Sequence, residues 1–172
     1  INFEFCDSEY AQRCRKAITT KVFPNIEEAV AAAKAHRDAL PAESPARSVL
    51  AHHYDRLVAT RCWYRCQRNI AGWIEGVHGY LEAEDEDTKA GCRALTREII
   101  LDEKANAKEL LKHVESAETD WMHVSDIGET TFIYGENFEE LLRRKIELME
   151  GREDDEPYID PDFMWRIPGI NA

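Results

Sequence analysis

The sequence predicts an all-α fold, an antiparallel helical bundle with long central helices and an irregular, aromatic C-terminal tail docked on it. Three observations support this class. Apolar residues recur at helical spacing over most of the chain, capping residues and prolines divide it into helix-sized segments, and the only strand-like run, at 130–134, has no partner strand. With 172 residues, we expect a single helical domain over 1–172, with 152–172 as an extended tail packed on the bundle.

The first two helices are predicted from their ends. Ser8 is the expected N-cap of a helix that fades at the Thr-Thr pair 19–20, where β-branched residues accumulate. Asn25, with Glu28 three residues later, forms a capping-box pattern at the start of the next helix. That helix is alanine-rich and ends at Pro41.

Two long helices follow. Ser44 is a cap before a proline at the first helical position, and the helix that begins there runs to about Glu84, roughly 60 Å at 1.5 Å per residue. Three glycines, at 72, 76 and 79, are expected to bend it. Asp87 is the expected cap of the next helix, over about 88–117. The short turn between the two predicts antiparallel neighbours.

A last helix is expected from Asn137, which has Glu140 at the capping-box position, to Gly151. Its apolar stripe includes Lys145, between Leu142 and Met149.

Composition narrows the classes of partner. The net charge of −12 argues against nucleic acid and anionic membrane surfaces, and no run approaches the ~20 apolar residues of a membrane span. The five cysteines form no C-x-x-C pair, so we expect free thiols, buried at Cys62 and Cys66, in a cytoplasmic protein. The start shows no signal peptide and no Met, which predicts a processed form or an excised fragment.

Polar residues interrupt the apolar stripes of the two long helices at matching heights. When the helices are folded about residues 85–86, Arg68 meets Glu103 or Asp102, and Arg65 meets Asn106. Three interpretations stay open: a partly buried ion-pair layer that sets helix register, a pocket whose charges await a ligand, or a solvated face. The predicted layer consists of Arg61, Arg65, Arg68, Asp102, Glu103 and Asn106.

Aromatic residues mixed with charges mark the two irregular segments on either side of the last helix. Such a mixture is typical of a sugar-binding face, and also of a tail that packs on a bundle. As packing groups, Trp121, Tyr134, Tyr158 and Trp165 would be buried against the long helices. The predicted ligand or partner face consists of Trp121, Glu129, Tyr134, Glu136, Trp165 and Arg166.

No motif in the chain indicates a reaction. A ferritin-like di-iron site needs Glu-x-x-His pairs, and the pairs closest to that pattern, Glu109 with His113 and Glu118 with His123, have the wrong spacing. We therefore expect no catalytic residue, metal or cofactor in this chain.

The phrases GETTFIYGENFEELLRRKIELM and DDEPYIDPDFMWR resemble the C-terminal helical region of large bacterial proteins built around a glycoside-hydrolase-type TIM barrel, of the hexosaminidase-like or α-glucuronidase-like kind. The resemblance covers about the last two-thirds of the chain. It implies a non-catalytic accessory domain that packs on a catalytic barrel domain, with carbohydrate as a possible ligand. The alternatives are a self-contained helical protein that acts through protein–protein contacts, for example as a homo-oligomer, and a small enzyme or ligand sensor that uses the Arg/acid layer.

Overall fold

The computed structural model describes residues 7–119 and 137–160. These residues form helices with no strand among them, so the all-α prediction is confirmed. The strand-like run 130–134 lies outside the described residues. The elements are α1 (Ser8–Ala17), the π-helical turn η2 (Ile18–Val22), α2 (Phe23–Asp38), α3 (Pro45–Glu82), α4 (Glu86–Ser116) and α6 (Phe138–Met149).

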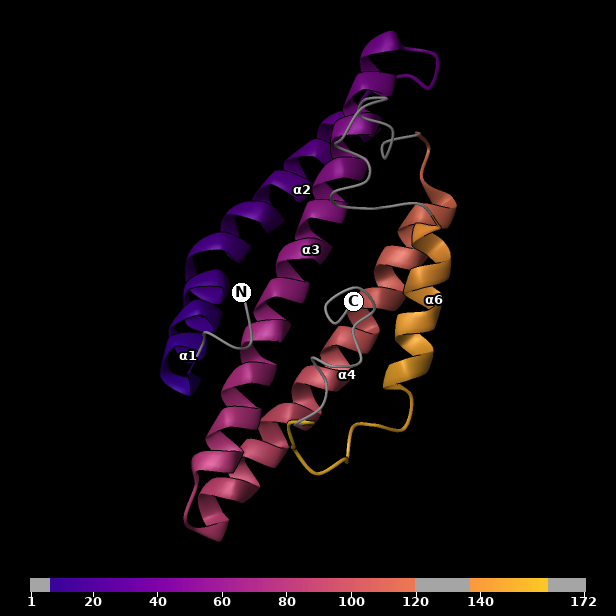
Figure 1. Ribbon diagram of the computed structural model, residues 1–172. Coiled ribbons are helices and arrows are strands. Elements are labelled where there is room, and N and C mark those ends of the chain that lie inside the picture. Colours follow the sequence, from indigo (N-terminus) through magenta and orange to yellow (C-terminus); the bar gives the residue numbers. More distant parts are fainter. Residues whose placement is uncertain (1–6, 120–136, 161–172) are drawn as a thin grey trace, which may run out of the picture.

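The helices lie side by side and alternate in direction. Figure 1 shows α3 between the rod formed by α1 and α2 on one side and α4 on the other, with α6 against α4. Apolar residues of α3, α4 and α6 meet in one cluster that includes Cys62, Leu110 and Leu142, and a smaller cluster joins Ala11 of α1 to Ile74 of α3. None of the helices in the described part of the chain has the apolar length that a membrane crossing requires.

The predicted break at 19–20 is wrong, because α1, η2 and α2 form one continuous helix. The Phe23 N–H donates to the carbonyl five positions back, which is the π-helical pattern. Pro24 follows and has no N–H to donate, and the wider turn accommodates it without ending the helix. Asn25 is therefore inside the helix, and its side-chain amide donates to the Lys21 carbonyl at 2.7 Å.

Two helix caps lie one or two residues earlier than predicted. Asp7, not Ser8, caps α1 and accepts a backbone N–H at 2.6 Å. Ser8 instead donates to the Glu75 carbonyl at 3.1 Å, which ties α1 to α3. Asp85, not Asp87, caps α4. In both places a carboxylate upstream of the predicted cap accepts a hydrogen bond from a backbone N–H of the first turn.

The start of α3 at Pro45 and the end of α6 just before Gly151 agree with the prediction. α3 begins at Pro45, and Gly151 has a φ of 74°, the left-handed conformation that glycine adopts after a helix. The prediction of a capping box at Asn137 is wrong. Asn137 has a φ of 60°, and its side chain makes no hydrogen bond to the start of the helix.

The glycines of α3 serve close packing. α3 is helical throughout Pro45–Glu82, and a Cβ on Gly76 would lie 2.6 Å from Thr96 Cγ2, while one on Gly72 would lie 2.5 Å from Ile99 Cδ1. Real Cβ atoms essentially never come within 3.0 Å of another atom, so a side chain at either position would have to displace the α4 side chain that it meets.

The first part of the predicted tail packs on α3 and α4. Glu156 accepts a bond from Tyr80 and pairs with Arg93 at 3.1 Å, and Pro157 is buried. The expectation that Tyr158 is buried is wrong, since 65% of this residue is exposed. The remainder of the tail, 161–172, lies outside the described residues.

Candidate functional site

An ion-pair layer joins α3 to α4 at the heights that the sequence indicates. Arg65 holds Asp102 with two bonds, Nη2 at 2.6 Å and Nε at 3.0 Å, and its Nη1 lies 3.0 Å from Glu109. Arg68 reaches the same Asp102 at 2.5 Å. Arg61 pairs with Glu109 as well. Three arginines on successive turns of α3 thus share two carboxylates of α4.

The partner predicted for Arg65 is wrong. Asn106 does not face Arg65; its amide donates to the Cys62 carbonyl at 3.0 Å and to Glu103 at 3.3 Å. The predicted height along the helices was correct, but the rotation of α4 about its own axis decides which residues meet. Arg65 lies on the side of Asp102, and Asn106 lies on the buried side with Glu103.

The buried side of the layer contains two residues that the sequence reasoning left out of it. The Asn69 amide donates to Asp102 and to Glu103, both at 2.8 Å. Lys145 of α6 binds the other oxygen of Glu103. A signal for Lys145 was present, because a lysine inside an apolar helix stripe needs a buried partner. Glu109 gave no such signal among the many carboxylates of an acidic chain.

The charges of the layer stabilise one another. Burial alone would raise the pKa of Asp102, but the hydrogen bonds from Arg65 and Asn69 and the positive charges of Arg65 and Arg68 outweigh it and hold that pKa at about 2. Burial would lower the pKa of Lys145, yet the negative charge of Glu103 raises it. Asp102 is therefore ionised at neutral pH, and Lys145 is charged.

The two cysteines beside the layer are poor nucleophiles. Burial, followed by the negative charge of Glu109, raises the pKa of Cys62 to about 11. Burial and the charge of Glu103 raise the pKa of Cys66 to about 11 as well. A thiol with such a pKa carries almost no thiolate at neutral pH.

Beside this layer, an open apolar groove lies between α3, α4 and α6. It encloses about 440 Å³, a volume within the usual range for binding pockets. Cys66, Asn69, Glu103, Lys145 and Arg152 supply its polar edge. Its apolar walls are Ile70, Trp73, Ile99, Ile100, Leu148 and Met149.

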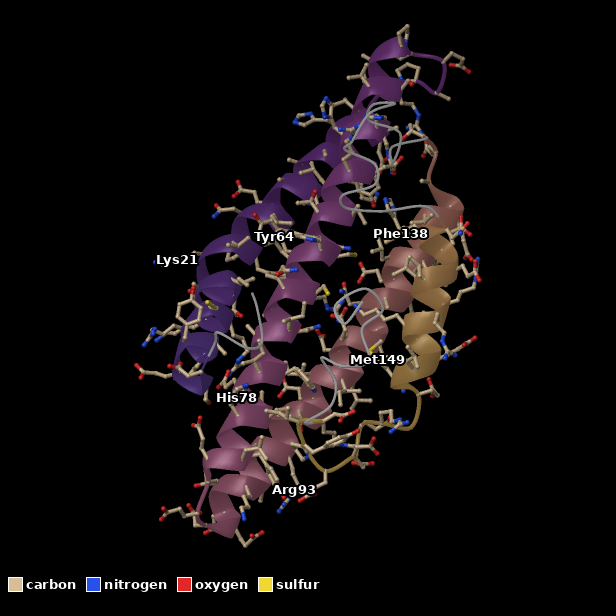
Figure 2. The ribbon with its side chains drawn as sticks, in the orientation of Figure 1. Lys21, Tyr64, His78, Arg93, Phe138 and Met149 are labelled. Atoms are coloured by element: carbon tan, nitrogen blue, oxygen red, sulfur yellow. The ribbon has the colours of Figure 1, made fainter. Side chains whose placement is uncertain are left out.

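The walls of the groove reach solvent. Trp73 is 38% exposed and Leu148 is 59% exposed. Phe138 and Met149 mark the two ends of α6 in Figure 2, and both pack toward the shared core. α6 is thus anchored along its length while Leu148 stays at the mouth of the groove.

A second hollow of about 250 Å³ continues the groove toward the tail. Trp73, Ile100, Leu148 and Arg152 line both hollows. The far wall of the second hollow contains Asp155, Glu156, Pro157 and Tyr158. The two hollows share part of their walls and form one elongated site. The carboxylates of its smaller end are paired with arginines of the chain, Asp155 with Arg152 and Glu156 with Arg93.

The predicted ligand or partner face cannot be placed beside this groove. All six of its members, Trp121, Glu129, Tyr134, Glu136, Trp165 and Arg166, lie outside the described residues. Within 7–119 and 137–160, no group of three or more His, Cys, Asp and Glu side chains is arranged to hold a metal ion.

Comparison with known protein families, with characterised proteins and with solved structures gives no match for this chain.

Proposed function

We propose that this chain is a non-catalytic helical accessory domain that binds a catalytic domain of its parent protein through the groove between α3, α4 and α6. The observation that carries the proposal is the exposure of Trp73 and Leu148 at the mouth of a groove whose walls are apolar. Exposed apolar side chains that gather at one hollow mark a surface for a partner, whereas scattered ones need no explanation.

The chemistry of the layer supports a contact role over a catalytic one. An acid–base residue needs a pKa near the working pH, whereas the pKa of Asp102 is held at about 2 and the thiols of Cys62 and Cys66 are held at about 11. The arginines of the layer are engaged with carboxylates of the same layer, as in the register-setting interpretation.

The resemblance of the last two-thirds of the chain to the helical regions of glycoside-hydrolase-type proteins supplies the class of partner. On this proposal the partner is the TIM-barrel domain of a carbohydrate-active enzyme. Apolar side chains of the barrel fill the groove. The ion-pair layer behind the groove holds α3 and α4 in register, and Lys145 fixes α6 to the same layer.

The test is association in trans. The chain is mixed with the remainder of the protein encoded by its natural reading frame, and complex formation is followed by sedimentation velocity. Leu148→Glu removes an apolar contact worth about 1.5–3 kcal/mol when buried, so we expect it to weaken the complex at least tenfold. Leu141→Glu is the matched control, because Leu141 is also on α6 and is 57% exposed but does not line the groove.

Two results would overturn the proposal. One is a reading frame that encodes no catalytic domain. The other is a complex that Leu148→Glu and Leu141→Glu weaken equally. A dimer of the isolated chain that only Leu148→Glu disrupts would instead assign the groove to a second copy.

A further inference from the structure

Residues 150–158, which follow α6, form a strap that crosses from the end of α6 to α4 and α3. Figure 1 shows the strap in yellow, running from α6 to the part of α4 with which Glu156 pairs. Within the described residues, the backbone hydrogen bonds of the strap stay between Glu147 and Asp155, and none of them reaches α4. Side chains therefore hold the strap in place.

Three cations of α4 pair with carboxylates of the strap in antiparallel order. Arg93 pairs with Glu156 at 3.1 Å, Arg97 pairs with Asp154, and Lys104 lies 3.4 Å from Glu150 and 3.6 Å from Glu153. The three cations are four and seven positions apart, so they share one face of the helix. Each pair is exposed to solvent on at least one side, and such pairs are weak singly and are screened by salt.

The strap is also one wall of the groove. Arg152 lines both hollows, and the far wall of the smaller hollow consists of Asp155, Glu156, Pro157 and Tyr158. The opposite wall belongs to α3 and α4, which the core holds in place. When the strap leaves α4, the far wall leaves with it, and the smaller hollow becomes open surface.

We infer that the strap is an ionic latch: it completes the groove while its carboxylates are paired with α4, and the groove binds its partner more weakly when these pairs are lost. The coupling to partner binding rests on the proposed function. A partner that binds the closed form favours it, and its apparent affinity falls with the fraction of chains whose strap is closed. Salt lowers this fraction, because it screens the ion pairs.

Thiol alkylation distinguishes the closed strap from the open one. Pro157 is buried, so the thiol introduced by Pro157→Cys is protected while the strap is closed. The full chain with this change is treated with iodoacetamide, an uncharged reagent, and labelling at position 157 is measured by mass spectrometry. We expect labelling to be about threefold faster in 0.5 M NaCl than in 0.05 M NaCl.

A charge swap tests the ion pairs themselves. Arg97→Glu places a like charge against Asp154, and neither residue lines a hollow. At low salt we expect it to speed labelling about fivefold and to weaken the complex with the proposed partner domain about threefold. Adding Asp154→Lys should restore both values, which a mere loss of helix stability would not allow. Arg143→Glu is the matched control, because Arg143 is 49% exposed, against 48% for Arg97, and pairs with Glu115 and Glu139 instead of the strap.

Equal labelling in Arg97→Glu and Arg143→Glu would overturn the inference, because the ion pairs would then not hold the strap. Faster labelling without a weaker complex would overturn it as well, provided that Leu148→Glu still weakens that complex, because the strap would then not complete the groove. If Leu148→Glu leaves the complex intact, the proposed function fails, and labelling at position 157 still decides whether ion pairs close the strap.

Discussion

Replacing Asp102 by asparagine should destabilise the bundle. This side chain accepts bonds from Arg65, Arg68 and Asn69. Asparagine keeps its shape but removes the negative charge that all three donors share. It also presents an amide donor to two guanidinium groups, so the positive charges of Arg65 and Arg68 lose their common partner.

The magnitude follows from the pKa of Asp102. A fall from the usual 3.8 to about 2, at 1.36 kcal/mol per pH unit, corresponds to about 2.5 kcal/mol of stability at neutral pH. The side chain is 26% exposed, and solvent screens part of this interaction. We therefore expect Asp102→Asn to lower the free energy of unfolding by about 1.5–2 kcal/mol.

The contribution of Asp102 to the stability of the fold depends on pH. The folded-state pKa of Asp102 lies below its unfolded value, so its contribution is present above pH 3.8 and is lost as the pH falls through about 2. About half of the contribution is lost by pH 3. The stability difference between the natural protein and Asp102→Asn should therefore be constant from pH 7 to 5 and should be halved at pH 3.

The assay is urea unfolding followed by circular dichroism at 222 nm, at pH 7, 5 and 3. Asp154→Asn is the control, because Asp154 pairs with Arg97 on the surface and lines no part of the layer. We expect no measurable change from the control. The reasoning is refuted if the two variants are equally stable, or if the deficit of Asp102→Asn is the same at pH 3 as at pH 7.

Two further predictions concern packing and thiol chemistry. Gly76→Ala should destabilise the fold by about 1–2 kcal/mol, because its Cβ would press on Thr96. Gly91→Ala, whose Cβ would meet nothing within 4 Å, should stabilise the fold by about 0.5–1 kcal/mol. Urea unfolding measures both changes, and equal effects of the two variants would contradict the close packing of α3 on α4. The second prediction uses a variant in which Cys62 and Cys66 are the remaining cysteines. Its reaction with Ellman's reagent at pH 8 should be about a hundredfold slower than the reaction of an unperturbed thiol. A rate within threefold of the unperturbed thiol would show that burial does not raise the pKa values of these two cysteines.

The fold was predictable where local signals act alone. Pro45 and Gly151 mark a helix start and a helix end through their own backbone preferences, and the structure places both as expected. The break at 19–20 was predicted from the β-branched residues there and from the capping-box pattern at Asn25, whereas a π-helical turn keeps the helix continuous. The glycines of α3 predicted a bend because glycine weakens a helix, and the sequence does not show that α4 packs against two of them.

The candidate site was predictable only in part. The heights of Arg65, Arg68, Asp102 and Glu103 follow from folding two helices about a short turn. The choice of partners depends on helix rotation, which a one-dimensional pattern does not contain, so Arg65 was matched to the wrong residue. The groove was not predicted at all, because its walls come from three helices and the start of the tail, and only their relative placement creates it.

Hydrogen–deuterium exchange on the chain, alone and in complex with the catalytic domain that we propose as its partner, tests the central claim most directly. If the groove is the contact face, exchange should slow over 70–77 and 145–158 on complex formation, because these segments contain Trp73, Leu148 and Tyr158. Exchange over α1 and α2, on the opposite side of α3 in Figure 1, should stay unchanged. Slowed exchange over α1 and α2, with 145–158 unaffected, would contradict the account.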